Sequence, residues 1–191
     1  RDVTGIESDR AMISRAEDRN SREGLNYVVM DIMEVDSLFQ TSSFDAALCL
    51  GNTLVHLDGV EQIDQLLTKA AGLLKPGGKL LLQILNYDRI LDSGQTVLPV
   101  LDSANVRFRR NYAWKNGRMR FVTELELKKN GQVFKNDIPL YPLRREELLA
   151  CLAKAGLVRT ILYGGFSGEA FTPDSFVTIV ESGRLFEGEN V

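Results

Sequence analysis

The segment FDAALCL at 44–50 is almost wholly apolar, and it constrains the fold of this chain most. An apolar run of this length is typical of a strand buried on both faces, as in a parallel sheet. Residues 59–74 follow with apolar side chains near helical spacing, and the proline and glycines of Lys75-Pro76-Gly77-Gly78 end that helix. Because KLLLQIL at 79–85 predicts another strand, the order indicates two strands joined by a helical crossover.

The same alternation begins the chain. Residues 2–6 predict a strand, Ser8 is expected to cap a helix that contains Met12 and Ile13, and a second strand is expected at 26–32. Later segments of the same kinds are a helix at 144–155 and strands at 158–164 and 175–182. This pattern predicts an α/β fold, Rossmann-like and doubly wound, with a mostly parallel sheet and right-handed crossovers.

The pattern changes near residue 105. Alternating segments at 106–114, 118–128 and 132–141 are joined at Asn116-Gly117 and Asn130-Gly131. Asn-Gly between such segments is the strongest short-range signal for a β-hairpin. We therefore expect an antiparallel meander with charged residues on one face.

No internal repeat or linker interrupts the chain. We expect a single domain over 1–191, with the meander as an inserted subdomain at about 105–141.

Composition excludes several classes of function. The formal net charge of −3 gives no general attraction to nucleic acid or to an anionic membrane, so we expect neither as a partner. Two cysteines and one histidine offer no cluster for zinc, and we expect no metal. Because the sequence contains no run of 18 apolar residues and no export signal, a cytosolic location is expected.

In a doubly wound sheet, ligands bind at the carboxyl ends of the strands. Glu7 ends the first predicted strand. A carboxylate there either accepts hydrogen bonds from both hydroxyls of a ribose or lies in solvent at the start of a helix, where the helix dipole favours a negative charge. Asp31 ends the next strand, where it either accepts from an adenine amino group, with the Ile32 amide at the ring, or forms a turn.

A third group of candidates follows the strand at 44–50. Gly51 and Asn52 allow the backbone to approach a ligand closely. His56 is either a structural residue or a base. Cys49 is interpreted as a buried small hydrophobic residue without reactivity.

These motifs resemble the class I S-adenosylmethionine-dependent methyltransferases. The resemblance rests on VTGIESDRAMI (3–13), the aspartate in VVMDI (28–32), FDAALCLGNTLVHL (44–57) and LLKPGGKLLLQILNYDRIL (73–91). GNTLVHL and NYDRIL are similar to the glycine and sarcosine N-methyltransferase branch. The resemblance implies transfer of a methyl group from S-adenosylmethionine to nitrogen or oxygen of a small-molecule acceptor.

The resemblance also implies roles for individual residues. The implied cofactor-binding residues are Glu7 at the ribose, Asp31 and Ile32 at the adenine, Ser8 and Met12 flanking the adenine, Leu50 at the methionine end, and Asn52. His56 and Tyr87 are candidates to accept a proton from an amine nucleophile. Tyr112 and Trp114 either face a cationic substrate or belong to the core.

The sequence departs from the family pattern in two places. The Gly-rich loop that follows the family's first strand does not occur, so we expect a segment of about 40–60 residues before Arg1. Glycine-methylating relatives carry an arginine shortly before the Tyr-Pro that resembles Tyr141-Pro142, whereas this chain has Lys135-Asn136-Asp137. Free glycine is therefore not the expected acceptor.

Other interpretations remain open. A nicotinamide-dependent Rossmann oxidoreductase also uses an acidic residue after its second strand to bind a ribose. A methyltransferase-like module without catalysis is a further alternative. Arg107 and Arg109 share one strand face, and Arg118 and Arg120 share another; they either bind a carboxylate or phosphate or form a solvated face. A homodimer is also kept as an alternative.

Overall fold

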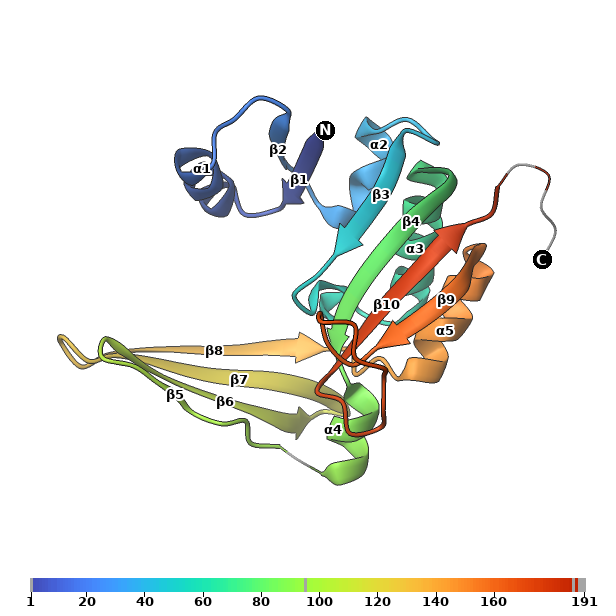
Figure 1. Cartoon of the computed structure of the whole chain (residues 1–191). Helices are drawn as coiled ribbons and strands as arrows, with labels where there is room; N and C mark the ends of the chain where they lie inside the picture. The colour runs from blue at the N-terminus through green and yellow to red at the C-terminus, as the bar shows by residue number, and fades with distance from the viewer. Residues whose placement is uncertain (1, 95, 187, 189–191) are drawn as a thin grey trace.

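The computed structural model describes residues 2–94, 96–186 and 188, and the strands of these residues form three sheets (Figure 1). The strands of the first two sheets are β1 (Val3–Glu7), β2 (Leu25–Val29), β3 (Phe44–Cys49), β4 (Leu74–Leu85), β9 (Leu157–Tyr163) and β10 (Val177–Arg184). β1 and β2 form a parallel pair, and the second sheet has the order β3-β4-β10-β9. Since β3 and β4 are parallel and only β10 reverses direction, the predicted α/β class with a mostly parallel strand direction is confirmed.

Helices α3 (Val60–Leu73) and α5 (Arg145–Lys154) pack against each other and cover one face of the four-stranded sheet (Figure 1). Their apolar side chains, among them Ile63 and Leu148, join Leu82 of β4 in the core, and each is completely buried. Burial of one such side chain contributes about 1.5–3 kcal/mol. The other helical segments are α1 (Arg10–Arg19), η1 (Ile32–Glu34), α2 (Val35–Leu38), η2 (Thr53–His56) and α4 (Tyr87–Ser93). Of the helices in the described part, none is long and apolar enough to span a bilayer.

The prediction that the strand at 44–50 is buried on both faces is wrong. Ala47 and Cys49 lie opposite the buried Leu80 and Leu82, so they share the face that α3 covers. Leu48 points the other way and is 65% exposed. Within the described residues, β3 pairs only with β4 and is therefore an edge strand. The exposure of Leu48 shows that its second face is also open.

The predicted helix cap is also one residue off. Asp9 caps α1, because its carboxylate accepts a hydrogen bond of 2.7 Å from the amide of Ala11. Ser8 instead donates to the carboxylate of Glu7 at 3.3 Å. Aspartate and serine are about equally good caps, so the sequence alone does not choose between neighbouring candidates.

The third sheet is the predicted meander, with one additional strand. Its strands are β5 (Leu101–Asp102), β6 (Val106–Lys115), β7 (Arg118–Leu127) and β8 (Gln132–Leu140), in that order. Asn116 and Gly117 both have left-handed backbone, with φ of 53° and 74°, as a two-residue hairpin turn requires. The meander projects from the sheet on the side to which β3 and β4 point (Figure 1).

Two glycines test whether the left-handed backbone of the Asn116-Gly117 turn favours glycine, because a Cβ added to either one meets nothing within 4 Å. Gly117 has a φ of +74°, so Gly117→Ala is expected to lower the free energy of unfolding by about 1–2 kcal/mol. Gly72 lies in α3 without a positive φ, so Gly72→Ala is expected to raise it by about 0.5–1 kcal/mol. Urea unfolding measures both changes, and equal changes in the two variants would contradict the assigned turn.

Candidate active site

The ends of β1, β3 and β4 all point toward the side where the meander lies (Figure 1). Ligands of Rossmann-like sheets bind at this carboxyl edge. Glu7 is the last residue of β1 and lies opposite Val29 of β2, and the amide of Met30 donates to the carbonyl of Glu7 at 2.9 Å. Asp31 follows directly, so the structure brings Glu7 and Asp31 to the same edge of the β1–β2 pair.

Each of these two acids already has a local role. Oε1 of Glu7 accepts from the amide of Asp9 at 3.0 Å, whereas no described residue donates to its second oxygen. One oxygen of Asp31 accepts from the amide of Met33 at 2.8 Å and caps η1. The turn-forming role of Asp31 is therefore present. Contacts of either residue with a nucleotide remain a prediction.

The expected apolar neighbours of the nucleotide differ in exposure. Met12 on α1 is 56% exposed, and Leu50 after β3 is 38% exposed. Ile32 is partly buried and packs against the core. Met12 and Leu50 therefore have apolar surface available to a ligand, whereas the side chain of Ile32 is used in packing and leaves the backbone as its candidate contact.

Asn52 connects the end of β3 to β4 and α4. Its backbone is left-handed, with a φ of 69°, and its side-chain oxygen accepts from the amide of Leu85 at 3.0 Å. Its side-chain nitrogen donates to the hydroxyl of Tyr87 at 3.0 Å. The amide of the preceding Gly51 donates to Oε1 of Gln83 on β4 at 2.8 Å. These bonds hold the turn after β3 against the neighbouring strand.

His56 and Tyr87, the two candidate proton acceptors, have different environments. His56 ends η2, is exposed and lines a cavity. Tyr87 is 1% exposed, and burial raises the pKa of its phenol, which keeps the hydroxyl neutral. The geometry therefore favours His56 over Tyr87 for accepting a proton.

The cavity measures about 340 Å³ and lies between the ends of β3 and β4 and the meander. This volume is in the range of sites for small molecules. Its lining comprises Gly51, Asn52, His56, Gln83 and Leu85 from the sheet side, Leu98, Arg110, Tyr112, Phe121 and Leu140 from the meander side, and Phe176 before β10.

Sequence reasoning missed several of these lining residues, including Gln83, Arg110 and Phe176. Phe176 reaches the cavity because Asn86, which is buried, donates to the carbonyls of Pro173 and Ser175 at 2.9 and 3.0 Å. No sequence motif marks such a loop anchor. Arg110 had a usable signal, since it lies two residues before Tyr112 and therefore shares its strand face.

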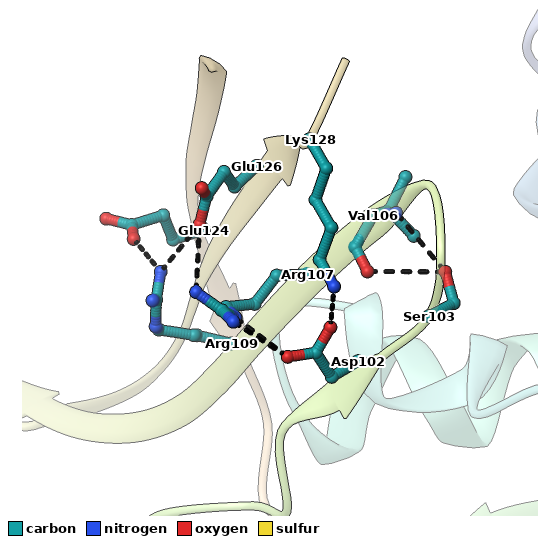
Figure 2. Close-up of polar contacts among 8 residues, drawn as sticks. All are labelled: Asp102, Ser103, Val106, Arg107, Arg109, Glu124, Glu126 and Lys128. Atoms are coloured by element: carbon teal, nitrogen blue, oxygen red, sulfur yellow. Dashed lines mark hydrogen bonds and ion pairs between the residues drawn. The ribbon is translucent and has the colours of Figure 1, made fainter. Parts of the chain in front are cut away.

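Arg107 and Arg109 lie on the face of β6 opposite to Tyr112, and Figure 2 shows that they pair with acids. Arg107 contacts Asp102 at 2.9 Å, Arg109 contacts Glu124 at 2.6 Å, and Lys128 also contacts Asp102. On β7, Arg120 contacts Asp137 at 2.7 Å. Exposed ion pairs of this kind contribute little to stability. The structure thus favours the solvated strand face over an anion-binding role for Arg107, Arg109 and Arg120.

Neither cysteine is placed as a nucleophile. Burial raises the pKa of Cys49 to about 11. Burial, together with the nearby carboxylate of Asp64, raises that of Cys151 to about 12. Both thiols are neutral near pH 7, and the thiolate is the reactive form. Trp114 lies on β6 and is 57% exposed, outside the set of residues that lines the cavity.

Known proteins share parts of this sequence and its fold. Residues 1–82 match the family described as "Methyltransferase domain". Over 97% of its length the chain superposes on an S-adenosylmethionine-dependent methyltransferase from Clostridium acetobutylicum, with a TM-score of 0.80, 12% identity and 76% of that protein covered. The amino pentose methyltransferase CalS10 from Micromonospora echinaspora gives a TM-score of 0.66, 21% identity, and coverage of 96% and 74%. Residues 1–82 are thus similar to a methyltransferase domain, and the chain shares the fold of S-adenosylmethionine-dependent methyltransferases.

Among curated proteins, the chain is similar to glycine/sarcosine N-methyltransferases. The protein from Aphanothece halophytica is 30% identical over 171 residues, which are 86% of this chain and 61% of that protein. The protein from Parasynechococcus marenigrum is 26% identical over 148 residues, which are 75% of this chain and 50% of that protein. The chain thus spans 50–61% of the length of these two relatives.

Asn52 provides a direct test of the site's framework. Asn52→Gly is expected to lower the free energy of unfolding by about 1–3 kcal/mol, because glycine accepts the left-handed backbone but leaves the amide of Leu85 and the hydroxyl of Tyr87 unpaired. Tyr87→Phe removes one of the two bonds and is expected to cost about 0.5–1.5 kcal/mol. Urea unfolding measures both variants. Unchanged stability of Asn52→Gly would show that the side chain does not hold the turn.

Proposed function

We propose that the protein transfers a methyl group from S-adenosylmethionine to nitrogen of a small-molecule acceptor. The observation that carries this proposal is the cavity of about 340 Å³ at the carboxyl edge of β3 and β4, next to the exposed Leu50. The names of the relatives support nitrogen as the methylated atom, since they are glycine/sarcosine and amino pentose methyltransferases. The acceptor would enter beside His56 and Asn52.

The residues at the edge fit the cofactor. Glu7 has a carboxylate oxygen to which no described residue donates, at the position where ribose hydroxyls would bind. Met12 and Leu50 expose apolar surface of the kind that a purine and a thioether cover. When bound, S-adenosylmethionine supplies a methyl group already activated by the positive charge of its sulfur.

The chain then has to orient the acceptor and exclude water. Alignment of two reacting centres can contribute about 7–11 kcal/mol to lowering a barrier. Phe121, Leu140 and Phe176 supply apolar walls, and Asn52 holds the turn that forms one side of the cavity. His56 accepts the proton that an ammonium acceptor must lose before its nitrogen can attack.

Calorimetric titration separates this proposal from its alternatives. We expect the protein to bind S-adenosylmethionine and S-adenosylhomocysteine and to show no heat of binding with NAD. Binding of NAD alone would favour the oxidoreductase. If the protein binds neither sulfur nucleotide nor NAD, the methyltransferase-like module without catalysis is supported and the proposed function fails.

Glu7→Ala tests the ribose contact. We expect affinity for S-adenosylhomocysteine to fall by about 1–3 kcal/mol, the cost of leaving buried hydrogen-bonding groups unmade. Glu23→Ala, an exposed glutamate before β2, is the matched control and is expected to bind normally. Calorimetry measures both, with thermal unfolding to verify the fold. Unchanged affinity in Glu7→Ala would contradict the ribose contact.

Other expectations remain predictions. The single domain over 1–191 with its insertion at about 105–141, the cytosolic location and the absence of a nucleic-acid partner rest on the sequence pattern and charge. The homodimer stays an alternative that the oligomeric state in solution would decide.

A further inference from the structure

Much of the cavity wall is apolar. The lining includes the hydrocarbon side chains of Leu85, Leu98, Phe121, Leu140 and Phe176. They come from β4, from the meander and the segment before it, and from the loop before β10, so segments far apart in the sequence form one wall. Ligand sites are commonly lined in this way, with a few polar groups that fix orientation. The wall therefore carries information about the ligand.

Phe176 differs from the rest of the wall in its exposure. It is 56% exposed, whereas Leu98 and Leu140 are buried. A side chain that the protein already covers gains little more from a ligand, because the favourable term scales with the apolar area removed from water. Phe176 still has such area. A ligand that packs against this ring therefore gains apolar contact that the protein itself does not make.

Asn86 fixes the position of Phe176. The backbone amide of Asn86 donates to the carbonyl of Phe176 at 3.1 Å, and its side-chain nitrogen donates to the carbonyls of Pro173 and Ser175. The turn before Phe176 is closed by Ser175, whose hydroxyl oxygen accepts from the amide of Thr172 at 2.9 Å. The backbone that carries the ring is thus held in place without a ligand, so binding does not have to order it.

Several polar atoms at the strand ends are engaged within the protein. Asn52 accepts from the amide of Leu85 and donates to the hydroxyl of Tyr87. Oε1 of Gln83 accepts from the amide of Gly51. A polar ligand would bind these atoms only by displacing their present partners, which would leave buried groups unpaired. The engaged atoms therefore favour a ligand that meets the wall through apolar contact.

Arg110 also lines the cavity, but the contacts of its guanidinium lie elsewhere. Nη2 donates to the carbonyl of Pro99 at 2.9 Å, and Cζ lies 5.5 Å from the centre of the Phe108 ring. Neither of these two partners is among the described residues that line the cavity. A long charged side chain can present its hydrocarbon stem to an apolar surface while its charge lies outside. Arg110 is therefore compatible with an apolar ligand.

The size of the cavity points to the same kind of ligand. Its volume of about 340 Å³ equals that of roughly eleven water molecules at about 30 Å³ each. A two-carbon acceptor leaves water against the apolar wall, which is unfavourable. A hydrocarbon group of several carbons displaces that water.

We propose that the methyl acceptor is an amine whose non-reacting part is a hydrocarbon group, and that Phe176 determines this specificity by packing against that group. This inference rests on the proposed function and names the substrate class of its cavity. The ammonium nitrogen first loses one proton to His56. It then forms a bond to the methyl carbon, while the bond from that carbon to sulfur breaks and its electron pair stays on sulfur. The hydrocarbon group takes no part in this exchange and supplies binding energy.

A series of alkylamines tests the substrate class. Ethylamine, butylamine and hexylamine share the same reacting group, so differences in their methylation report the contact of the chain. We expect kcat/KM to rise by about threefold for each added methylene. In the matched control, 5-aminopentanol, a hydroxyl replaces the terminal methyl of hexylamine, and we expect kcat/KM to fall by about tenfold.

Three outcomes of this series overturn the proposal. The first is a kcat/KM that does not depend on chain length, including methylation of none of the amines. The second is equal use of hexylamine and 5-aminopentanol. The third is a higher kcat/KM for sarcosine, which appears in the names of the relatives, than for hexylamine.

Variants test the role of Phe176. Phe176→Ala is expected to raise KM for hexylamine by about tenfold and KM for ethylamine by less than about twofold. Phe176→Leu keeps an apolar side chain and is expected to restore most of the loss. Phe166→Ala is the matched control, because Phe166 belongs to the same loop, is 68% exposed and is not among the described residues that line the cavity. It is expected to leave both KM values unchanged.

Thermal unfolding and calorimetry with S-adenosylhomocysteine verify that the variants fold and bind the nucleotide. An unchanged KM in Phe176→Ala, or an equal rise for both amines, overturns the role of Phe176. If the unaltered protein binds S-adenosylhomocysteine but does not prefer longer amines, the substrate class is wrong and the proposed function stands. If it binds neither sulfur nucleotide, the proposed function itself fails.

Discussion

The amide side chain of Asn52 makes the contact on which the arrangement of the candidate site depends. It binds the amide of Leu85 and the hydroxyl of Tyr87, and so ties the end of β3 to the point where β4 passes into α4. Both partners are at least partly buried, and an unpaired group there would be costly. Because asparagine also tolerates left-handed backbone, one residue provides both the turn and its anchor.

The meander contributes through the difference between its two faces. Arg107, Arg109 and Arg120 pair with acids on one face, where solvent screens each charge. Tyr112 and Phe121 lie on the other face and close the cavity against the sheet. The same antiparallel register produces both faces, since neighbouring residues along a strand point in opposite directions. Although the formal net charge of the chain is −3, the cationic side chain of Arg110 therefore lines the cavity.

Much of the fold could be predicted because its signals are local. The helix at 59–74, the meander strands and the Asn116-Gly117 turn follow from periodicity and turn chemistry, and each lies within a few residues of its predicted place. Predictions that depended on neighbours were less accurate. The open face of β3 follows from what packs on that strand, and the choice of Asp9 over Ser8 as the cap follows from where α1 begins.

For the site, the sequence by itself determined which residues follow the strands: Glu7 and Asp31 at the ends of β1 and β2, and Asn52 and His56 after β3. Strand order and alternation suffice for that, because they depend on near neighbours in the chain. Only the tertiary structure decided that Arg110 and Tyr112 meet Gln83 and Phe176 around one cavity. Desolvation arises from segments far apart in sequence that pack together, and no local pattern encodes it.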